Sequence, residues 1–223
     1  MILKEKIFDS ESGDPAEGIL AGLEPYLKRE PLLFSPEGSA LLVLDMQGYF
    51  VDPGSRALVP SAPDIVQVVS SLAGAFEAAD APAVFTRHID VKGQAGMMER
   101  WWGGLICRED PLSEIWHELR SEDCEVLDKS KYDAFLGTGL DGRLRDAGVE
   151  RLVIAGVMTH LCVETTVRSA FMRDYEVFVA VDATATYNRE LFDGALRSMA
   201  HGFAVPVSSR SIIEAFKGRK LDG

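Results

Sequence analysis

Short apolar runs alternate with longer amphipathic segments over most of the chain. The apolar runs predict strands at 40–45, 82–87, 124–127, 151–155, 176–181 and 203–207. Apolar residues spaced three or four positions apart predict helices at 63–78, 111–119, 138–147, 161–173, 188–201 and 210–217. Strands made of uninterrupted apolar residues are typical of a parallel sheet covered on both faces. The pattern therefore predicts an α/β domain in which helices flank a mainly parallel sheet.

The first 36 residues precede this alternation. They contain one predicted amphipathic helix at 17–28, followed by Pro31 and Pro36, which a helix does not tolerate in its interior. We interpret residues 1–36 as an arm that packs on the domain or on a neighbouring subunit. Residues 37–223 then form a single domain, which is an ordinary size for one hydrophobic core.

Composition narrows the possible partners and surroundings. The chain has 35 acidic and 23 basic residues, a formal net charge of −12 and no basic stripe, so we expect no nucleic-acid partner. It also lacks an apolar run long enough to span a membrane, and we expect no membrane association. Three cysteines without metal-ligand spacing, and a start without the apolar region of a signal peptide, predict a reduced, cytoplasmic protein.

One cysteine lies where a thiol can become a nucleophile. The apolar strand 151–155 leads into Gly156, and the pattern then changes to helical, so that Cys162 falls at or near the first turn of the predicted helix. Unpaired N–H groups and the positive dipole end at such a place favour a thiolate and can hold an oxyanion. Cys107 and Cys124 have no comparable setting and are interpreted as small buried hydrophobic residues.

An acid and a base follow two other strands. Asp45 comes directly after the apolar run 40–44, and Lys129 follows the strand at 124–127. In open parallel sheets, sites form outside the carboxyl ends of the strands, so we expect Asp45, Lys129 and Cys162 to meet. An acid, a cation and a thiol in one place are suited to amide hydrolysis through a covalent intermediate.

Five short motifs resemble those of the isochorismatase-like cysteine hydrolases, the family that includes nicotinamidase, N-carbamoylsarcosine amidase and isochorismatase. In family order, the motifs are residues 42–47 (LVLDMQ), 85–88 (FTRH), 129–135 (KSKYDAF), 156–163 (GVMTHLCV) and 181–183 (VDA). The resemblance covers about residues 38–210. It implies a three-layer α/β/α Rossmann-like fold with a six-stranded mainly parallel sheet, a small-molecule substrate and a homodimer or homotetramer.

The resemblance also implies a role for each central residue. Cys162 attacks a carbonyl carbon, Asp45 takes the thiol proton and later gives it to the leaving group, and Lys129 holds Asp45 and favours the thiolate. Backbone N–H groups of Met158 and Cys162 form the oxyanion hole, and the peptide bond before Met158 is cis in relatives. Lys131 is the rival of Lys129, which is preferred because it stands three positions before Tyr132.

The substrate-binding candidates lie near the same strand ends. They are Tyr49, Phe50, His88, Trp102 and Tyr132. The glycine-rich segment 88–110 is typical of a lid. Relatives that bind a metal carry an Asp-x-His motif, whereas this chain has Asp52-Pro53-Gly54. We therefore expect no metal ion and no cofactor.

Three functional hypotheses follow. The first is a hydrolase of C–N bonds in a small carboxamide, carbamoyl or ureido compound, acting through a Cys162 acyl-enzyme. The alternative is an isochorismatase-type vinyl-ether hydrolase that uses Asp45 and Lys129 without the thiol, which the resemblance of residues 45–50 and of Trp102-Gly103 to isochorismatases favours. The third is a non-catalytic binding subunit, in which the cysteine would show no unusual reactivity.

Overall fold

The computed structural model describes residues 3–8, 15–27, 32–120 and 124–218. Within them, six strands form one sheet in the order β3-β2-β1-β4-β5-β6, and every pair of neighbours is parallel. The strands are β1 (Ser39–Leu44), β2 (Ala83–His88), β3 (Glu125–Lys129), β4 (Arg151–Val157), β5 (Glu176–Ala185) and β6 (Val205–Val207). The prediction of a six-stranded sheet is confirmed, and the sheet is parallel throughout.

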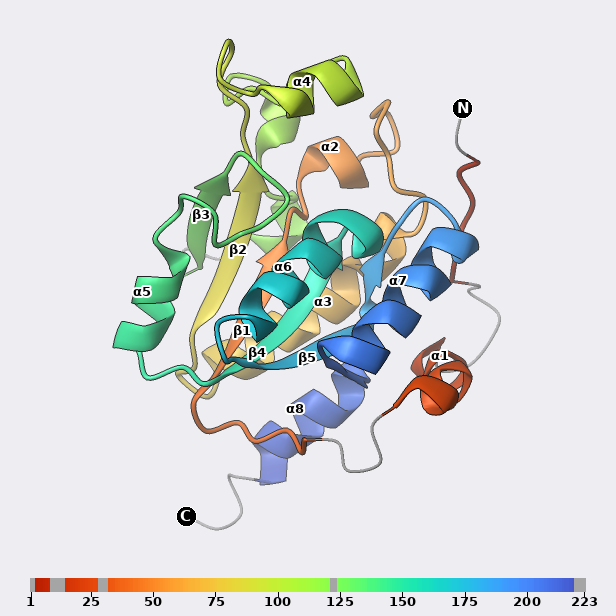
Figure 1. The fold of residues 1–223 in the computed structure, drawn as a ribbon, viewed down its shortest axis with the longest axis vertical. Helices are drawn as coiled ribbons and strands as arrows, with labels where there is room; N and C mark the ends of the chain where they lie inside the picture. Colours follow the sequence, from red (N-terminus) through yellow and green to blue (C-terminus); the bar gives the residue numbers. More distant parts are fainter. Residues whose placement is uncertain (1–2, 9–14, 28–31, 121–123, 219–223) are drawn as a thin grey trace.

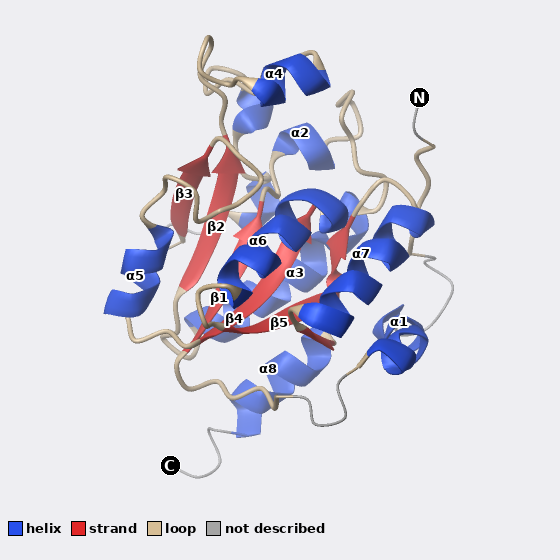
Figure 2. Ribbon diagram, viewed as in Figure 1, coloured by secondary structure: helices blue, strands red, loops and turns tan. Residues whose placement is uncertain are grey.

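Helices cover both faces of the sheet, as Figures 1 and 2 show. The helices are α1 (Pro15–Leu23), α2 (Gly48–Val51), α3 (Ala62–Glu77), α4 (Met97–Trp102), α5 (Leu140–Asp146), α6 (Glu164–Phe171), α7 (Arg189–Gly202) and α8 (Ser209–Gly218). In the view of Figure 1, α5, α6 and α7 lie in front of the sheet and α3 and α8 lie behind it. The predicted three-layer α/β/α arrangement is therefore confirmed.

Alternate residues of each strand feed two separate cores. In β1, Leu42 and Leu44 pack toward α5, α6 and α7, whereas Leu41 and Val43 pack toward α3 and α8. Successive side chains of a strand point to opposite faces, so a strand covered on both faces must be apolar at every position. This is why β1 reads as an uninterrupted apolar run, and all six of its residues are buried.

The close packing of β1 against β4 requires a glycine where the site begins. Gly156 pairs with Leu44 at the carboxyl end of both strands and has a φ of 102°. A Cβ atom at Gly156 would overlap the carbonyl oxygen of Leu44 and lie 2.6 Å from its nitrogen. Asp45, the next residue, has a φ of 52°, a left-handed conformation that aspartate tolerates better than most residues.

Several element boundaries differ from the sequence-based expectation. The predicted helix 161–173 is a π-helical turn, Thr159–Val163, followed by α6, and the predicted helix 111–119 is two 3₁₀ turns, Pro111–Ser113 and His117–Leu119. The irregular segment 88–110 contains the short helix α4. The predicted helix 17–28 corresponds to α1 and a 3₁₀ turn, Glu24–Tyr26, and residues 28–31 lie outside the described part of the chain.

The described residues of the N-terminal arm contact the core of the same chain. Ala16, Ile19 and Leu23 of α1 are buried in the core that α7 and β5 also form. Nearer the N-terminus, the backbone N–H of Ile7 donates to Ser61 Oγ at 2.8 Å. No helix among the described residues has the length and apolar character needed to cross a lipid bilayer.

Candidate functional site

The three residues predicted to meet do so at the carboxyl ends of β1, β3 and β4. Lys129 Nζ lies 2.6 Å from Asp45 Oδ2 and 3.3 Å from Cys162 Sγ. The side chains of Asp45 and Lys129 are 1% and 0% exposed. One ammonium group thus contacts both the acid and the thiol, away from bulk water.

Neighbouring elements hold this cluster in place. The Thr86 hydroxyl, on β2, donates to Asp45 Oδ1 at 2.6 Å, and Lys129 Nζ donates to the carbonyl oxygen of Lys131 at 3.0 Å. Asp45 Oδ2 is buried and accepts no hydrogen bond of good geometry within the described residues, so the ion pair with Lys129 is its contact.

The rival cation, Lys131, points elsewhere. Its Nζ donates to the carbonyl oxygen of Ala95 at 2.9 Å, in the segment that precedes α4. Lys131 therefore ties the loop after β3 to the lid segment, and Lys129 alone of the two contacts Asp45 and Cys162.

Burial and charge set the resting protonation of the cluster. Burial raises the pKa of the Cys162 thiol, the negative charge of Asp45 raises it further, and Lys129 only partly opposes them. For Lys129, burial lowers the pKa, but Asp45 and Cys162 together outweigh it and the net pKa is raised. Lys129 lowers the pKa of Cys162, as expected, but burial and the carboxylate of Asp45 raise it more, and the net pKa is raised. With both pKa values raised, Cys162 is a thiol and Lys129 is an ammonium group at neutral pH.

Cys162 lies on a locally irregular backbone. Met158, which follows β4, is joined to Val157 by a cis peptide bond, and Cys162 belongs to the π-helical turn that comes next. Both residues line the same cavity. On the far side of this turn, His160 Nδ1 lies 2.5 Å from Thr186 Oγ1, and burial lowers the pKa of its ring. His160 does not line the cavity and anchors the turn to the segment after β5.

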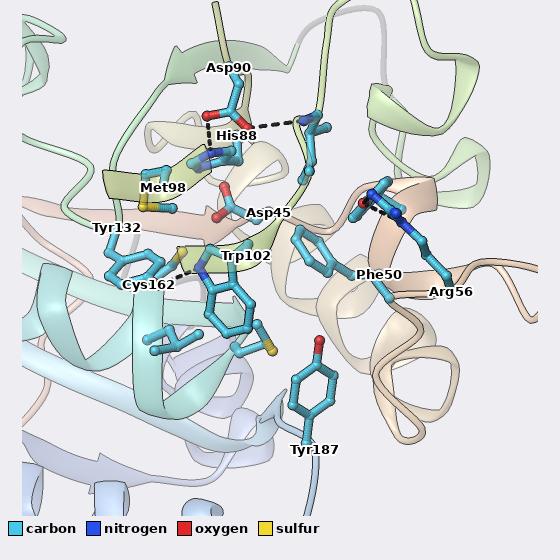
Figure 3. A pocket seen from close by; sticks show the side chains of 16 residues that line it. Asp45, Phe50, Arg56, His88, Asp90, Met98, Trp102, Tyr132, Cys162 and Tyr187 are labelled. Atoms are coloured by element: carbon cyan, nitrogen blue, oxygen red, sulfur yellow. Dashed lines mark hydrogen bonds and ion pairs between the residues drawn. The ribbon is translucent and has the colours of Figure 1, made fainter. Parts of the chain in front are cut away.

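A cavity of about 270 Å³ opens beside the cluster (Figure 3). Its wall combines aromatic and aliphatic side chains with a few polar groups, the composition expected of a small-molecule site. The residues that line it are Asp45, Tyr49, Phe50, Arg56, Ala57, His88, Asp90, Met98, Trp102, Gly104, Ile106, Tyr132, Met158, Leu161, Cys162 and Tyr187.

All five substrate-binding candidates lie in this wall. Tyr49, Phe50, His88, Trp102 and Tyr132 line the cavity. The Trp102 indole N–H donates to the Tyr132 hydroxyl at 2.7 Å, which joins α4 of the lid to the loop after β3. Trp101, in contrast, is 75% exposed and does not line the cavity.

Sequence reasoning missed several residues of the wall. Arg56, Asp90 and Tyr187 belong to it but lie in segments without a motif. Asp90 Oδ1 lies 3.1 Å from His88 Nε2, and Asp90 Oδ2 accepts the backbone N–H of Ile106 at 3.0 Å. Burial raises the pKa of Asp90, but these hydrogen bonds outweigh it and the net pKa is lowered. The only sequence signal for Asp90 is its place two residues after His88, just past the end of β2.

Comparison with known proteins identifies the family. The isochorismatase domain model matches residues 39–211, which is most of the chain. The chain belongs to the isochorismatase family. It is a hydrolase of that family, as the five motifs predicted.

Named relatives of this isochorismatase-family hydrolase include amidases. The chain is 34% identical over 196 residues to nicotinamidase 3 of Arabidopsis thaliana, covering 86% of this chain and 93% of the relative. It is 30% identical over 220 residues to the ureidoacrylate amidohydrolase RutB of Pantoea ananatis, covering 81% and 88%. Among solved structures, a cysteine hydrolase from Pseudomonas syringae pv. phaseolicola matches with a TM-score of 0.81 and 28% identity, covering 86% of this chain and 99% of the other.

Residues 52–54 stand where the Asp-x-His motif of metal-binding relatives is expected. Asp52 Oδ1 accepts the backbone N–H of Gly54 at 2.7 Å, and Gly54 offers no side-chain ligand. Over the ranges that the structure describes, no group of three His, Cys, Asp or Glu side chains is arranged to hold a metal ion.

Proposed function

We propose that the protein hydrolyses a C–N bond in a small carboxamide, carbamoyl or ureido compound through a covalent intermediate on Cys162. The observation that carries this proposal is the buried contact of one lysine with both a carboxylate and a thiol beside a cavity. The named amidases among the relatives support the choice of a C–N bond.

The first half of the reaction forms a thioester from a carboxamide, or the corresponding thiocarbamate from a carbamoyl or ureido compound. Because the resting thiol is neutral, its proton passes to Asp45 as Sγ attacks the substrate carbonyl carbon. The carbonyl oxygen becomes an oxyanion, for which backbone N–H groups of Met158 and Cys162 are the proposed donors. Asp45 then gives the proton to the leaving nitrogen, and the C–N bond breaks.

The second half restores the enzyme. Asp45 removes a proton from a water molecule that attacks the thioester carbonyl carbon. The C–S bond breaks, the proton returns to sulfur, and the acid product leaves. Lys129 remains an ammonium group throughout, because its net pKa is raised, and it stabilises whichever of Asp45 and Cys162 carries the negative charge.

The test measures ammonia release from a panel of primary amides, ureas and N-carbamoyl compounds. We expect turnover by the wild type and a loss of at least about 10³-fold in kcat for Cys162→Ala, the scale on which removal of a nucleophile acts. Cys107→Ala is the matched control, because Cys107 is half-buried and does not line the cavity. Full activity of Cys162→Ala would contradict the proposal.

Cys162→Ala, together with Asp45→Ala, also distinguishes amide hydrolysis from the alternative, vinyl-ether hydrolysis, which needs a proton donor and no thiol. Asp45 and Lys129 alone are sufficient for that chemistry. Isochorismate turnover that survives Cys162→Ala and is lost in Asp45→Ala, without amide turnover by the wild type, would favour the alternative.

A further inference from the structure

Among the described residues, one cation in the wall of the cavity forms no ion pair. Arg56 follows α2, and its Nε and Nη2 donate to the Tyr49 hydroxyl at 3.1 and 2.9 Å. Among the described residues, no carboxylate lies within ion-pair distance of its guanidinium group. The Tyr49 contacts fix the orientation of the group and leave its other N–H donors unused.

The two acidic residues of the cavity wall, Asp45 and Asp90, have other partners than Arg56. Asp45 is paired with Lys129 and bonded to Thr86, while Asp90 is bonded to His88 and to the Ile106 N–H. In Figure 3 the Asp45 carboxylate points away from Arg56, and the dashed lines from Asp90 end on His88 and on a neighbouring segment. The cavity wall therefore carries Asp45 and Cys162 together with a guanidinium group that forms no ion pair among the described residues, although the charge of Asp110 acts on it from farther away.

Figure 3 shows Cys162 and Arg56 on opposite sides of the cavity, with Phe50 between them in the view. A substrate whose carbonyl carbon lies at Cys162 therefore directs its far end toward the guanidinium group. A planar guanidinium with fixed orientation favours a carboxylate, which can accept two parallel hydrogen bonds.

A glycine makes room for this arginine. A Cβ atom at Gly104 would overlap Arg56 Nη2 and lie 3.4 Å from its Cζ atom. Only the end of a long side chain would have to move, so an alanine at position 104 displaces the guanidinium group from its Tyr49 contacts without disturbing the backbone.

We propose that Arg56 is the specificity-determining residue of this site and binds the carboxylate of an amide or ureido acid at the end remote from Cys162. This inference rests on the proposed function for its substrate class. Binding to Arg56 can nevertheless be measured without turnover.

The experiment compares 3-ureidopropionate with propylurea, a neutral compound of similar length, for binding to Cys162→Ala by calorimetry. We expect the acid to bind about 10- to 100-fold more tightly, the range for charge-assisted hydrogen bonds. Arg56→Gln and Gly104→Ala, each in the Cys162→Ala background, should abolish this preference and leave propylurea binding unchanged. Arg100→Gln makes the same charge change on the exposed face of α4, away from the cavity wall, and should have no effect.

Turnover separates this inference from the proposed function. In the protein with Cys162 intact, Arg56→Gln should raise KM for the acid about 10- to 100-fold at nearly constant kcat. The KM of Arg56→Lys should lie between those of the wild type and Arg56→Gln. Absence of amide turnover by the wild type would overturn the proposed function, and the binding preference would still decide the role of Arg56. Equal binding of the acid and propylurea to Cys162→Ala, or binding of neither, would overturn the inference.

Discussion

The ion pair between Asp45 and Lys129 is the most sensitive single contact of the site. Both side chains are withdrawn from water, and each charge is stabilised mainly by the other. Removal of one partner from such a pair leaves a buried charge uncompensated, which costs far more than the pair itself contributes. A substitution at either residue is therefore expected to lower both the free energy of unfolding and the proposed activity.

Replacement of Lys129 should reveal both effects. We expect Lys129→Met to lower the free energy of unfolding by about 3–5 kcal/mol and to abolish turnover. Lys92→Met, at an exposed position of the lid segment, is the control and should change stability by less than about 0.5 kcal/mol. Urea unfolding followed by circular dichroism measures both, and equal stability of the two variants would contradict the role of the buried pair.

The raised pKa of Cys162 predicts slow alkylation. A thiol with a pKa above the ordinary value is mostly protonated at neutral pH, so iodoacetamide should modify Cys162 more slowly than the half-buried Cys107 and Cys124 at pH 7. Asp45→Asn removes a charge that raises the pKa and should accelerate labelling at a given pH. Mass spectrometry across pH 6–10 measures each site, and selective labelling of Cys162 below pH 7 would show that the thiolate is favoured instead.

At the scale of elements, the sequence predicts where the site lies but not its local geometry. Asp45, Lys129 and Cys162 each follow an apolar run, and parallel strands bring their carboxyl ends to one edge, so their meeting is predictable. The π-helical turn at 159–163 is not predictable from the sequence, because the spacing of its apolar residues resembles that of an α-helix. The need for glycine at position 156 is not predictable either, because it comes from close contact with the backbone of Leu44, a residue distant in sequence.

Substitution of Gly156 should show how much the close packing of β1 against β4 contributes to stability. Gly156→Ala places a Cβ atom against the backbone of Leu44, and its φ of 102° is unfavourable for alanine. We expect a loss of at least about 3 kcal/mol in the free energy of unfolding, or no folded protein. Gly194→Ala, at an exposed position of α7 with open space around it, should instead stabilise by about 0.5–1 kcal/mol. Urea unfolding of both proteins checks the prediction, and similar effects of the two substitutions would contradict it.

At the scale of the whole molecule, the family, the fold and the central cluster were accessible from the sequence, whereas the cavity wall was only partly so. Tyr49, Phe50 and Tyr132 were found because they adjoin motifs. Arg56 and Tyr187 were missed because loops bring them together from distant parts of the chain. The net rise in the pKa of Cys162 could not be read from the sequence, because burial and the nearby carboxylate, which cause it, are three-dimensional properties.

The excess of acidic residues predicts that salt stabilises the fold. A net charge of −12 repels itself more strongly in the compact state than in the expanded unfolded chain, and the Debye length falls from about 30 Å at 0.01 M to about 3 Å at 1 M ionic strength. Exposed pairs such as Lys6–Asp64 also weaken in salt but contribute little. At pH 7 we expect the melting temperature to rise by about 2–4 °C between 10 and 300 mM NaCl, equivalent to roughly 1 kcal/mol. Near pH 5, close to the calculated isoelectric point of 4.8, the rise should vanish. A fall with salt at pH 7 would mean that surface ion pairs outweigh the net repulsion.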